Sequence, residues 1–260
     1  MKAKAISTTT LVPLTLAMVM GTAMPLTAQA ELAGNIGVHS KYLLRGIGLE
    51  NDNTAVQGGI DYTNESGFYA GWWGSNLGYS YNTGAAPDPD GNGFENDFYA
   101  GFAGSTGDIS YKLGVIQYYY LEVDDSDLTE ILANVGYGPL TMQMQYLAND
   151  GVWGNAGDIY WTVNYTAALP SDFTFGASLG WYTYDDDDNS ELCAGAGLAP
   201  GCSVTTEDSA FRHLNLTLSH PIADTGANMY IQYTIPGENR AGDDDFDDKI
   251  VMGLTYGFDI

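Results

Sequence analysis

The feature that most constrains the fold is the stretch at residues 67–76, which reads GFYAGWWGSN. Residues two apart on an extended strand point to the same face. A strand in a soluble β-sandwich buries one face and rarely places tryptophan on both, whereas a strand between lipid and a narrow lumen shows this pattern. One face would be apolar and would carry Phe68, Ala70 and Trp72. The other would mix aromatic rings, glycine and a hydroxyl and would carry Tyr69, Gly71, Trp73 and Ser75.

The same alternation recurs about twelve times from Gly34 to the C-terminus, an even number within the range of bacterial outer-membrane barrels. The first predicted strand runs from Gly34 to Gly46 and turns Tyr42 and Leu44 to the lipid, with Lys41 and Arg45 to the lumen. The sequence therefore predicts an all-β fold, a transmembrane antiparallel up-and-down β-barrel of about twelve strands.

The predicted connections alternate between short and long. Barrels of this class have short periplasmic turns and longer external loops, so we expect both termini in the periplasm. Aspartate runs, such as residues 124–127, 185–188 and 243–247, fall in the long connections and place negative charge in water. The short connections are residues 64–67, 104–108, 138–139, 167–172 and 220–226, and the long ones include residues 78–93, 147–157, 185–208 and 236–247.

The N-terminus has the three parts of a secretory signal peptide. Lys2 and Lys4 are basic, residues 11–20 are apolar, and residues 28–30 read AQA. We predict a signal peptide over residues 1–30 and a mature barrel over residues 31–260, exported by the Sec pathway to the outer membrane of a Gram-negative bacterium. The alternative is a retained membrane anchor, for which the apolar run is short.

The predicted mature chain is strongly acidic. Without the two signal lysines, 8 − 2 = 6 basic residues face 33 acidic ones, which gives a net charge of −27. This balance argues against nucleic acid as a partner. We expect membrane lipid and permeating small ions or polar solutes as partners, and the oligomeric state stays open.

Several short stretches resemble the TorF-like porin family of proteobacterial outer-membrane proteins, whose function is not established. The resemblance implies a barrel and a channel, and it supplies no substrate. The first hundred or so residues carry it, in NIGVHSKYLLRG, QGGIDY, GFYAGWWGSN and ENDFYAG. The matching positions are Asn35, Ser40, Tyr42, Arg45, Gly46, Gln57, Gly58, Asp61, Gly67, Tyr69, Gly71, Trp73, Ser75, Glu95, Asp97, Tyr99 and Gly101, with Glu130 further on.

The predicted lumen face carries the candidate selectivity residues. In the predicted register, strand pairing puts Arg45 near the level of Ser75 and Glu95. Lys41 falls near Trp73 and Asp97. A basic strand facing an acidic one creates a transverse field, and rings of charged side chains set pore selectivity. The candidates are Lys41, Arg45, Asp61, Trp73, Ser75, Glu95, Asp97 and Glu130.

Two interpretations of this lumen stay open. The first is a channel for passive diffusion of small ions or polar solutes, weakly cation-selective. The second is a ladder of ion pairs that fills the lumen, leaving a non-conducting barrel with a binding or structural role through its acidic external loops. Barrels of about eight strands are filled by side chains and those of about sixteen are open, so about twelve lies between.

The long connections carry two further candidates. Cys193 and Cys202 fall in one predicted external loop, where a disulfide is expected and two free thiols are the alternative. Asp88, Asp90 and Asn92 are spaced like the first half of a calcium loop, but Tyr99 stands where the bidentate acid belongs. A solvated acidic turn, or loose divalent cation binding by the clustered aspartates, is favoured over a formed metal site.

An enzyme is the rival class. His213 lies near a predicted rim, with Asp208 and Ser209 close in sequence. The sequence shows neither a nucleophile elbow nor ordered triad spacing. We therefore expect a protein that is not an enzyme and that needs no cofactor.

Overall fold

The computed structural model describes residues 30–49, 53–80, 88, 91–151, 154–185, 205–240 and 247–260 of the 260-residue chain. Within these residues the regular secondary structure is β-strand, and none of it is a helix that could cross a membrane. Residues 1–29 of the predicted signal peptide, Asp90, Cys193 and Cys202 lie outside the described residues.

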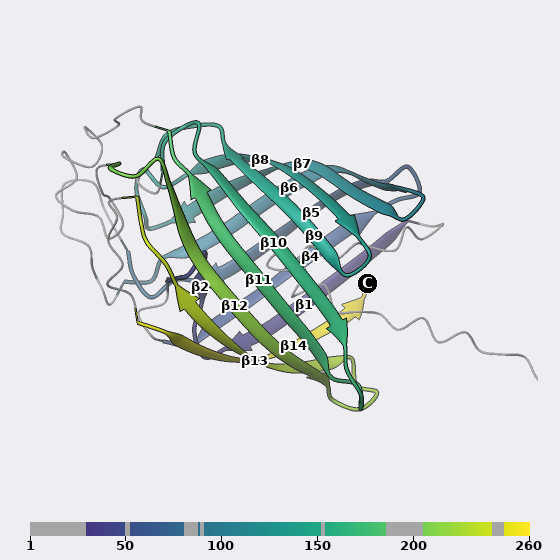
Figure 1. Cartoon of the computed structure of the whole chain (residues 1–260). Coiled ribbons are helices and arrows are strands. Elements are labelled where there is room, and N and C mark those ends of the chain that lie inside the picture. The colour runs from purple at the N-terminus through teal and green to yellow at the C-terminus, as the bar shows by residue number, and fades with distance from the viewer. Residues whose placement is uncertain are drawn as a thin grey trace, which may run out of the picture.

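Twelve strands of the described residues form one closed barrel (Figure 1). Each strand pairs antiparallel with its neighbours in chain order, and β1 closes the ring against β14. The predicted fold is therefore confirmed. The strands are β1 (Glu31–His39), β4 (Ala55–Thr63), β5 (Phe68–Asn76), β6 (Phe94–Thr106), β7 (Ile109–Leu121), β8 (Leu128–Tyr137), β9 (Leu140–Leu147), β10 (Ile159–Ala168), β11 (Thr174–Thr183), β12 (Ser209–Pro221), β13 (Ala227–Pro236) and β14 (Lys249–Asp259).

The connections divide the barrel into two ends (Figure 1). Glu31 pairs with Thr63, directly before the short turn at residues 64–67, and β14 finishes at the same end. The connection between β6 and β7 is only Gly107 and Asp108, and Gly107 has φ 58, a conformation that glycine adopts without strain. The strand ends that flank the long connections lie at the opposite end, so the short–long alternation in the sequence is present in the structure.

The outer face of the barrel is apolar. Large hydrophobic side chains on the outward phase of the strands are exposed, as a lipid-facing surface requires. Aromatic rings add contacts on this face: Tyr62 and Phe68 lie 6.4 Å apart near the short turns, and the Trp161 and Trp181 rings stack 6.2 Å apart nearer the long loops. The exposed residues include Ile36, Val38, Ile60, Leu113, Val115, Ile131, Met142, Leu179, Ile231, Met252 and Leu254.

The predicted first strand is wrong beyond His39. Pairing of β1 with β4 ends at His39 and Ala55, and the chain then turns into the lumen. There it forms a small hairpin of β2 (Leu43–Leu44) and β3 (Ile47–Gly48), which we call the inner hairpin. Arg45 and Gly46 have φ 52 and 85, the two positive values of a tight reversing turn, so the chain cannot continue as a strand.

The inner hairpin carries an apolar core into the barrel. Tyr42 is 8% exposed and lies inside, not on the lipid face as predicted. Leu44 and Ile47 pack against the same cluster. The buried core therefore sits within the long-loop end of the lumen. Its members are Tyr42, Leu49, Ala55, Leu77, Tyr79, Ile116, Tyr118, Tyr120, Val123, Leu128 and Leu147.

Candidate functional site: the barrel lumen

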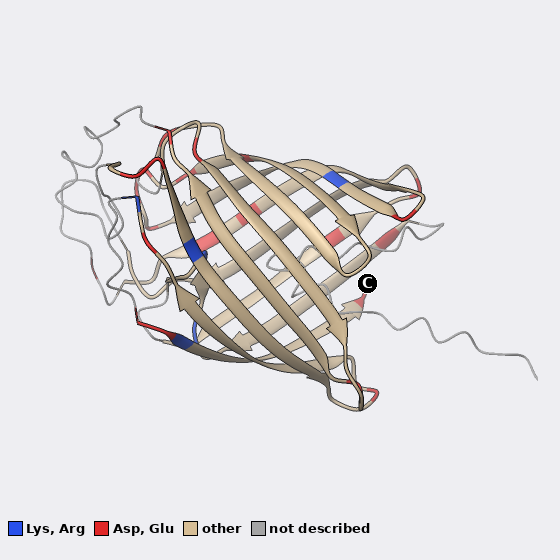
Figure 2. Ribbon diagram, viewed as in Figure 1, with Lys and Arg blue, Asp and Glu red and all other residues tan. Residues whose placement is uncertain are grey.

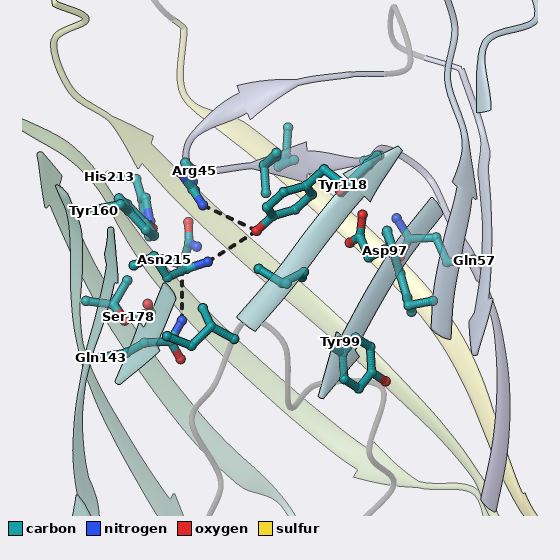
Figure 3. A pocket seen from close by; sticks show the side chains of 18 of the residues that line it. Arg45, Gln57, Asp97, Tyr99, Tyr118, Gln143, Tyr160, Ser178, His213 and Asn215 are labelled. Carbon is teal, nitrogen blue, oxygen red and sulfur yellow. Dashed lines mark hydrogen bonds between the residues drawn. The ribbon is translucent and has the colours of Figure 1, made fainter. Parts of the chain in front are cut away.

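A cavity of about 210 Å³ lies inside the barrel (Figure 3). The inner hairpin and residues from most of the strands line it. Lys41 and Arg45 reach it from the first long connection, and Asp61, Trp73 and Asp97 reach it from β4, β5 and β6. The lumen is therefore partly filled and partly open at this level.

Arg45, at the tip of the inner hairpin, ties the hairpin to strands across the barrel. The hairpin is rooted between β1 and β4, whereas Glu130 belongs to β8. Arg45 Nη2 donates to Glu130 Oε1 at 2.8 Å and to Oε2 at 2.7 Å. The guanidinium also donates to the Tyr182 hydroxyl and lies 4.4 Å from the centre of the Tyr160 ring. The hairpin therefore crosses the lumen from wall to wall.

Gly46 lets the hairpin tip approach β12 closely. A Cβ atom at this position would lie 2.8 Å from the backbone carbonyl oxygen of Arg212, and the residue has φ 85. Both observations favour glycine. Arg212 sits where the register between β11 and β12 shifts, and both Arg212 and His213 are buried there.

Glu130 is a buried carboxylate with several donors. Besides Arg45, the Tyr118 hydroxyl donates to its Oε2 at 2.9 Å and Gln145 Nε2 donates to the same oxygen at 2.8 Å. Figure 3 shows Arg45 pointing toward the Tyr118 hydroxyl, to which its Nη2 donates at 3.5 Å. Buried charges persist in proteins when they are paired and hydrogen-bonded in this way.

Further acidic residues face the lumen from neighbouring strands. Glu95 and Asp97 are buried at successive inward positions of β6, and the Tyr120 hydroxyl donates to Glu95 at 3.0 Å. On β4, Asp61 accepts a hydrogen bond of 2.5 Å from Tyr99. Lys112 on β7 lies 4.2 Å from the centre of the Tyr69 ring. We call Asp61, Glu95, Asp97, Lys112 and Glu130 the charged wall.

The strands β9 to β13 present a different surface to the lumen. They contain no Asp, Glu or Lys, and their one Arg is Arg212. Figure 2 shows β10 and β11 without charged residues. Thr234 donates to Asn215 Oδ1 at 2.8 Å, and Gln232 Nε2 donates to Thr234 at 3.0 Å. We call Gln143, Thr162, Asn164, Ser178, Asn215, Thr217, Gln232 and Thr234 the neutral wall.

The structure places the predicted site residues inside the barrel, in two groups. Lys41, Arg45, Asp61, Trp73 and Asp97 line the cavity, and Ser75, Glu95 and Glu130 are buried nearby. Their role in selectivity stays a prediction.

The predicted register of Lys41 and Arg45 is wrong, because both lie beyond the end of β1. Pairing does bring Ser75 opposite Glu95 and Trp73 opposite Asp97. Arg45, however, bonds Glu130 on β8 instead of reaching the level of Ser75 through strand pairing.

Sequence reasoning missed two parts of this site. The Arg45–Gly46 pair, set between Leu44 and Ile47, was the available signal for a hairpin turn. The residues of the neutral wall alternate with apolar residues along their strands, which was the signal for an inward position, but their contacts depend on register between strands. The Ser178–Asn215 pair, for example, joins residues of β11 and β12.

The remaining predicted candidates have separate positions. His213 accepts or donates a 2.5 Å hydrogen bond with the Tyr160 hydroxyl inside the lumen, while Ser209 is exposed at the start of β12. Asp88 pairs through its backbone with Ser80. Among the described residues no group of three His, Cys, Asp or Glu is placed to hold a metal ion. Loose divalent cation binding by the loops stays a prediction.

The chain belongs to the family described as bacterial protein of unknown function (Gcw_chp), whose model matches residues 23–198. No curated protein matches the sequence. The TorF-like resemblance is thus supported at the level of a family of unknown function with a porin-like fold.

Solved outer-membrane porins share the fold. The KdgM porin is 10% identical with a TM-score of 0.54, over 87% of this chain and 99% of that chain. An outer membrane channel from Pseudomonas putida F1 is 10% identical with a TM-score of 0.53, over 92% and 98%. The NanC porin is 12% identical with a TM-score of 0.50, over 86% and 98%. At these identities the similarity establishes the fold alone.

Proposed function

We propose that this protein is an outer-membrane channel for passive diffusion of small ions and polar solutes, with a weak preference for cations. The observation that carries the proposal is the cavity of about 210 Å³, enclosed by a barrel with an apolar outside and lined by charged and neutral polar side chains. The porin fold and the resemblance of residues 35–101 to the TorF-like family support it. Export by the Sec pathway, with residues 1–30 removed, belongs to the same proposal.

The cation preference follows from the balance of charge along the path. The charged wall holds four carboxylates and one lysine, and Arg45 is paired with one of those carboxylates. The long loops add aspartates at the mouth, including Asp124 and Asp125. A mouth of one charge sign concentrates counter-ions, and this field weakens as salt rises. The lumenal charges lie closer to a permeating ion and are screened less.

Recording in planar lipid bilayers tests the proposal. Refolded protein, freed of residues 1–30, should conduct, and a salt gradient should give a reversal potential of cation-selective sign that declines with rising salt. A reversal potential of the opposite sign would mean that Lys41, Arg45 and Lys112 dominate the path. It would refute the cation preference while leaving the channel in place.

A second candidate is a non-conducting barrel that acts through its acidic external loops. The inner hairpin favours this candidate, because Arg45 fastens it across the lumen with an ion pair and two ring contacts. The two candidates differ in one measurement. Folded protein that inserts into bilayers and passes no current would overturn the channel and favour the binding or structural barrel.

A further inference from the structure

We propose that the neutral wall is a binding track for small uncharged polyhydroxylated solutes, such as monosaccharides and polyols. This inference rests on the proposed channel function and names a solute class for it. The track runs over the lumen face of β9 to β13, across the cavity from the charged wall. Figure 3 shows Gln143, Ser178 and Asn215 on one side and Asp97 and Tyr99 on the other.

Strand pairing assembles the central row of this track. Asn164 lies opposite Ser178, Ser178 lies opposite Asn215, and Asn215 lies opposite Thr234. Four consecutive strands thus contribute one amide or hydroxyl each, side by side. Their exposed fractions are 3% for Asn164, 1% for Ser178, 6% for Asn215 and 0% for Thr234. The row is therefore a built feature of the barrel interior, in which Ser178 and Asn215 line the cavity and Asn164 and Thr234 flank them on the neighbouring strands.

Part of this row has unused hydrogen-bonding capacity. The Asn164 amide donates to Thr162 Oγ1 at 3.3 Å, but its Oδ1 has no partner among the described residues. Ser178 Oγ, on the next strand, also has none within them. Buried polar groups in proteins are nearly always hydrogen-bonded, so adjacent unpartnered atoms indicate a polar guest. One acceptor beside one hydroxyl matches the donor and acceptor character of a solute hydroxyl group.

The electrostatics of the wall favour an uncharged guest. A charged solute that leaves water needs an opposite charge as partner, and β9 to β13 offer no Asp, Glu or Lys. Arg212 is the one charged residue of these strands, and it lies at the register shift beside the hairpin tip, where its Nη1 donates to the Glu238 carbonyl at 2.5 Å. Amides and hydroxyls bind neutral hydroxyl groups without that desolvation cost.

The cavity adds aromatic surface and sets a size. Tyr160 and Tyr230 line it beside the neutral wall. Small-molecule sites combine such apolar surface with a few directed polar groups. At about 210 Å³ the cavity falls below the roughly 300 Å³ at which pockets for drug-sized ligands begin, which favours single sugar units and small polyols over oligomers.

Sugar block of the ion current tests the track. In planar bilayers, glucose and sorbitol should reduce the wild-type current at a measurable half-blocking concentration. In the variant Asn164→Leu, Ser178→Ala, Asn215→Leu, that concentration should rise by roughly fivefold for each solute hydrogen bond lost. The matched control is Glu95→Gln on the charged wall, at a buried residue outside the cavity lining, which should change the reversal potential and leave the half-blocking concentration unchanged.

The outcomes separate the two proposals. Normal conductance with no sugar block, or with equal block in both variants, would overturn the binding track and leave the channel intact. Absence of current would overturn the channel. Titration calorimetry of sorbitol into detergent-purified protein then tests the binding track independently of conductance. Binding to the wild type that is lost in Ser178→Ala supports the binding track, and absence of heat with the wild type refutes it. Heat-modifiable migration on gels identifies variants that do not fold. If the triple variant does not fold, the single variant Ser178→Ala takes its place, because it is the mildest of the three substitutions.

Discussion

The charged wall and the neutral wall both consist of inward-facing residues of alternating strands, but they differ in how their polar groups are paired. On the charged wall, two carboxylates are held by hydrogen bonds: Glu130 accepts from Arg45, Tyr118 and Gln145, and Asp61 accepts from Tyr99. Glu95 Oε2 and Asp97 Oδ1 on the same wall have no partner among the described residues. On the neutral wall, Asn164 Oδ1 and Ser178 Oγ have no partner among the described residues. Charge thus fastens the inner hairpin through Arg45 and Glu130, and each wall keeps groups without a protein partner: carboxyl oxygens on the charged wall, and an amide oxygen and a hydroxyl on the neutral wall. Inward position alone therefore does not identify a permeation surface.

The largest effect should come from releasing the inner hairpin. Arg45→Ala leaves Glu130 buried without its cation, and breaking a buried pair in this way costs about 3–5 kcal/mol. The hairpin should leave the lumen, and single-channel conductance in planar bilayers should rise several-fold.

Arg240→Ala is the matched control for this experiment. It removes the cation of another ion pair, with Asp158, among residues that connect the strands at the long-loop end. It should change conductance little. Equal conductance in Arg45→Ala and wild type, with both barrels folded, would show that the hairpin does not limit the path.

A smaller effect should separate the walls by ion selectivity. Replacing Glu95 by Gln and Asp97 by Asn removes two carboxyl groups at buried lumenal positions. The reversal potential that persists in high salt should move toward zero, because these groups lie close to the permeating ion and are poorly screened. The neutral-wall variant Ser178→Ala should keep the wild-type reversal potential. A shift of equal size in Ser178→Ala would contradict the division into two walls.

The sequence and the structure agree where a short local pattern decides the outcome. The alternation in residues 67–76 correctly turned Trp73 and Ser75 inward, because facing depends only on position along the strand. The inner hairpin escaped prediction because residues 40–46 keep the same alternation while Arg45 and Gly46 adopt positive φ. The partners of Arg45 could not be predicted at all, since Glu130 lies 85 residues away and meets it only across the closed barrel.

Lys112 offers a test of the opposite sign on the charged wall. Lys112→Met removes a positive charge beside the lumen and should move the reversal potential further toward cation preference, against the direction of the Glu95 and Asp97 variant. Loss of its contact with the Tyr69 ring, now at 4.2 Å, should lower stability by about 0.5–2 kcal/mol. A shift toward anions would show that the wall's carboxylates do not act on the permeating ion.

The smallest effect should come from the loop charges, which lie outside both walls. Asp124→Asn with Asp125→Asn removes two charges at the mouth, and asparagine fits the positive φ of 55 at position 125. The Debye length is about 10 Å at 0.1 M salt and about 3 Å at 1 M, so a mouth field reaches the permeating ion only in dilute salt. Cation preference should therefore fall slightly at low salt and match the wild type at 1 M. The Glu95 and Asp97 variant should behave differently, because its cation preference should still be lower than that of the wild type at 1 M salt. If the loop variant also differs at 1 M, Asp124 and Asp125 lie close to the conduction path, and the selectivity of the pore is then set at its mouth as well as by the charged wall.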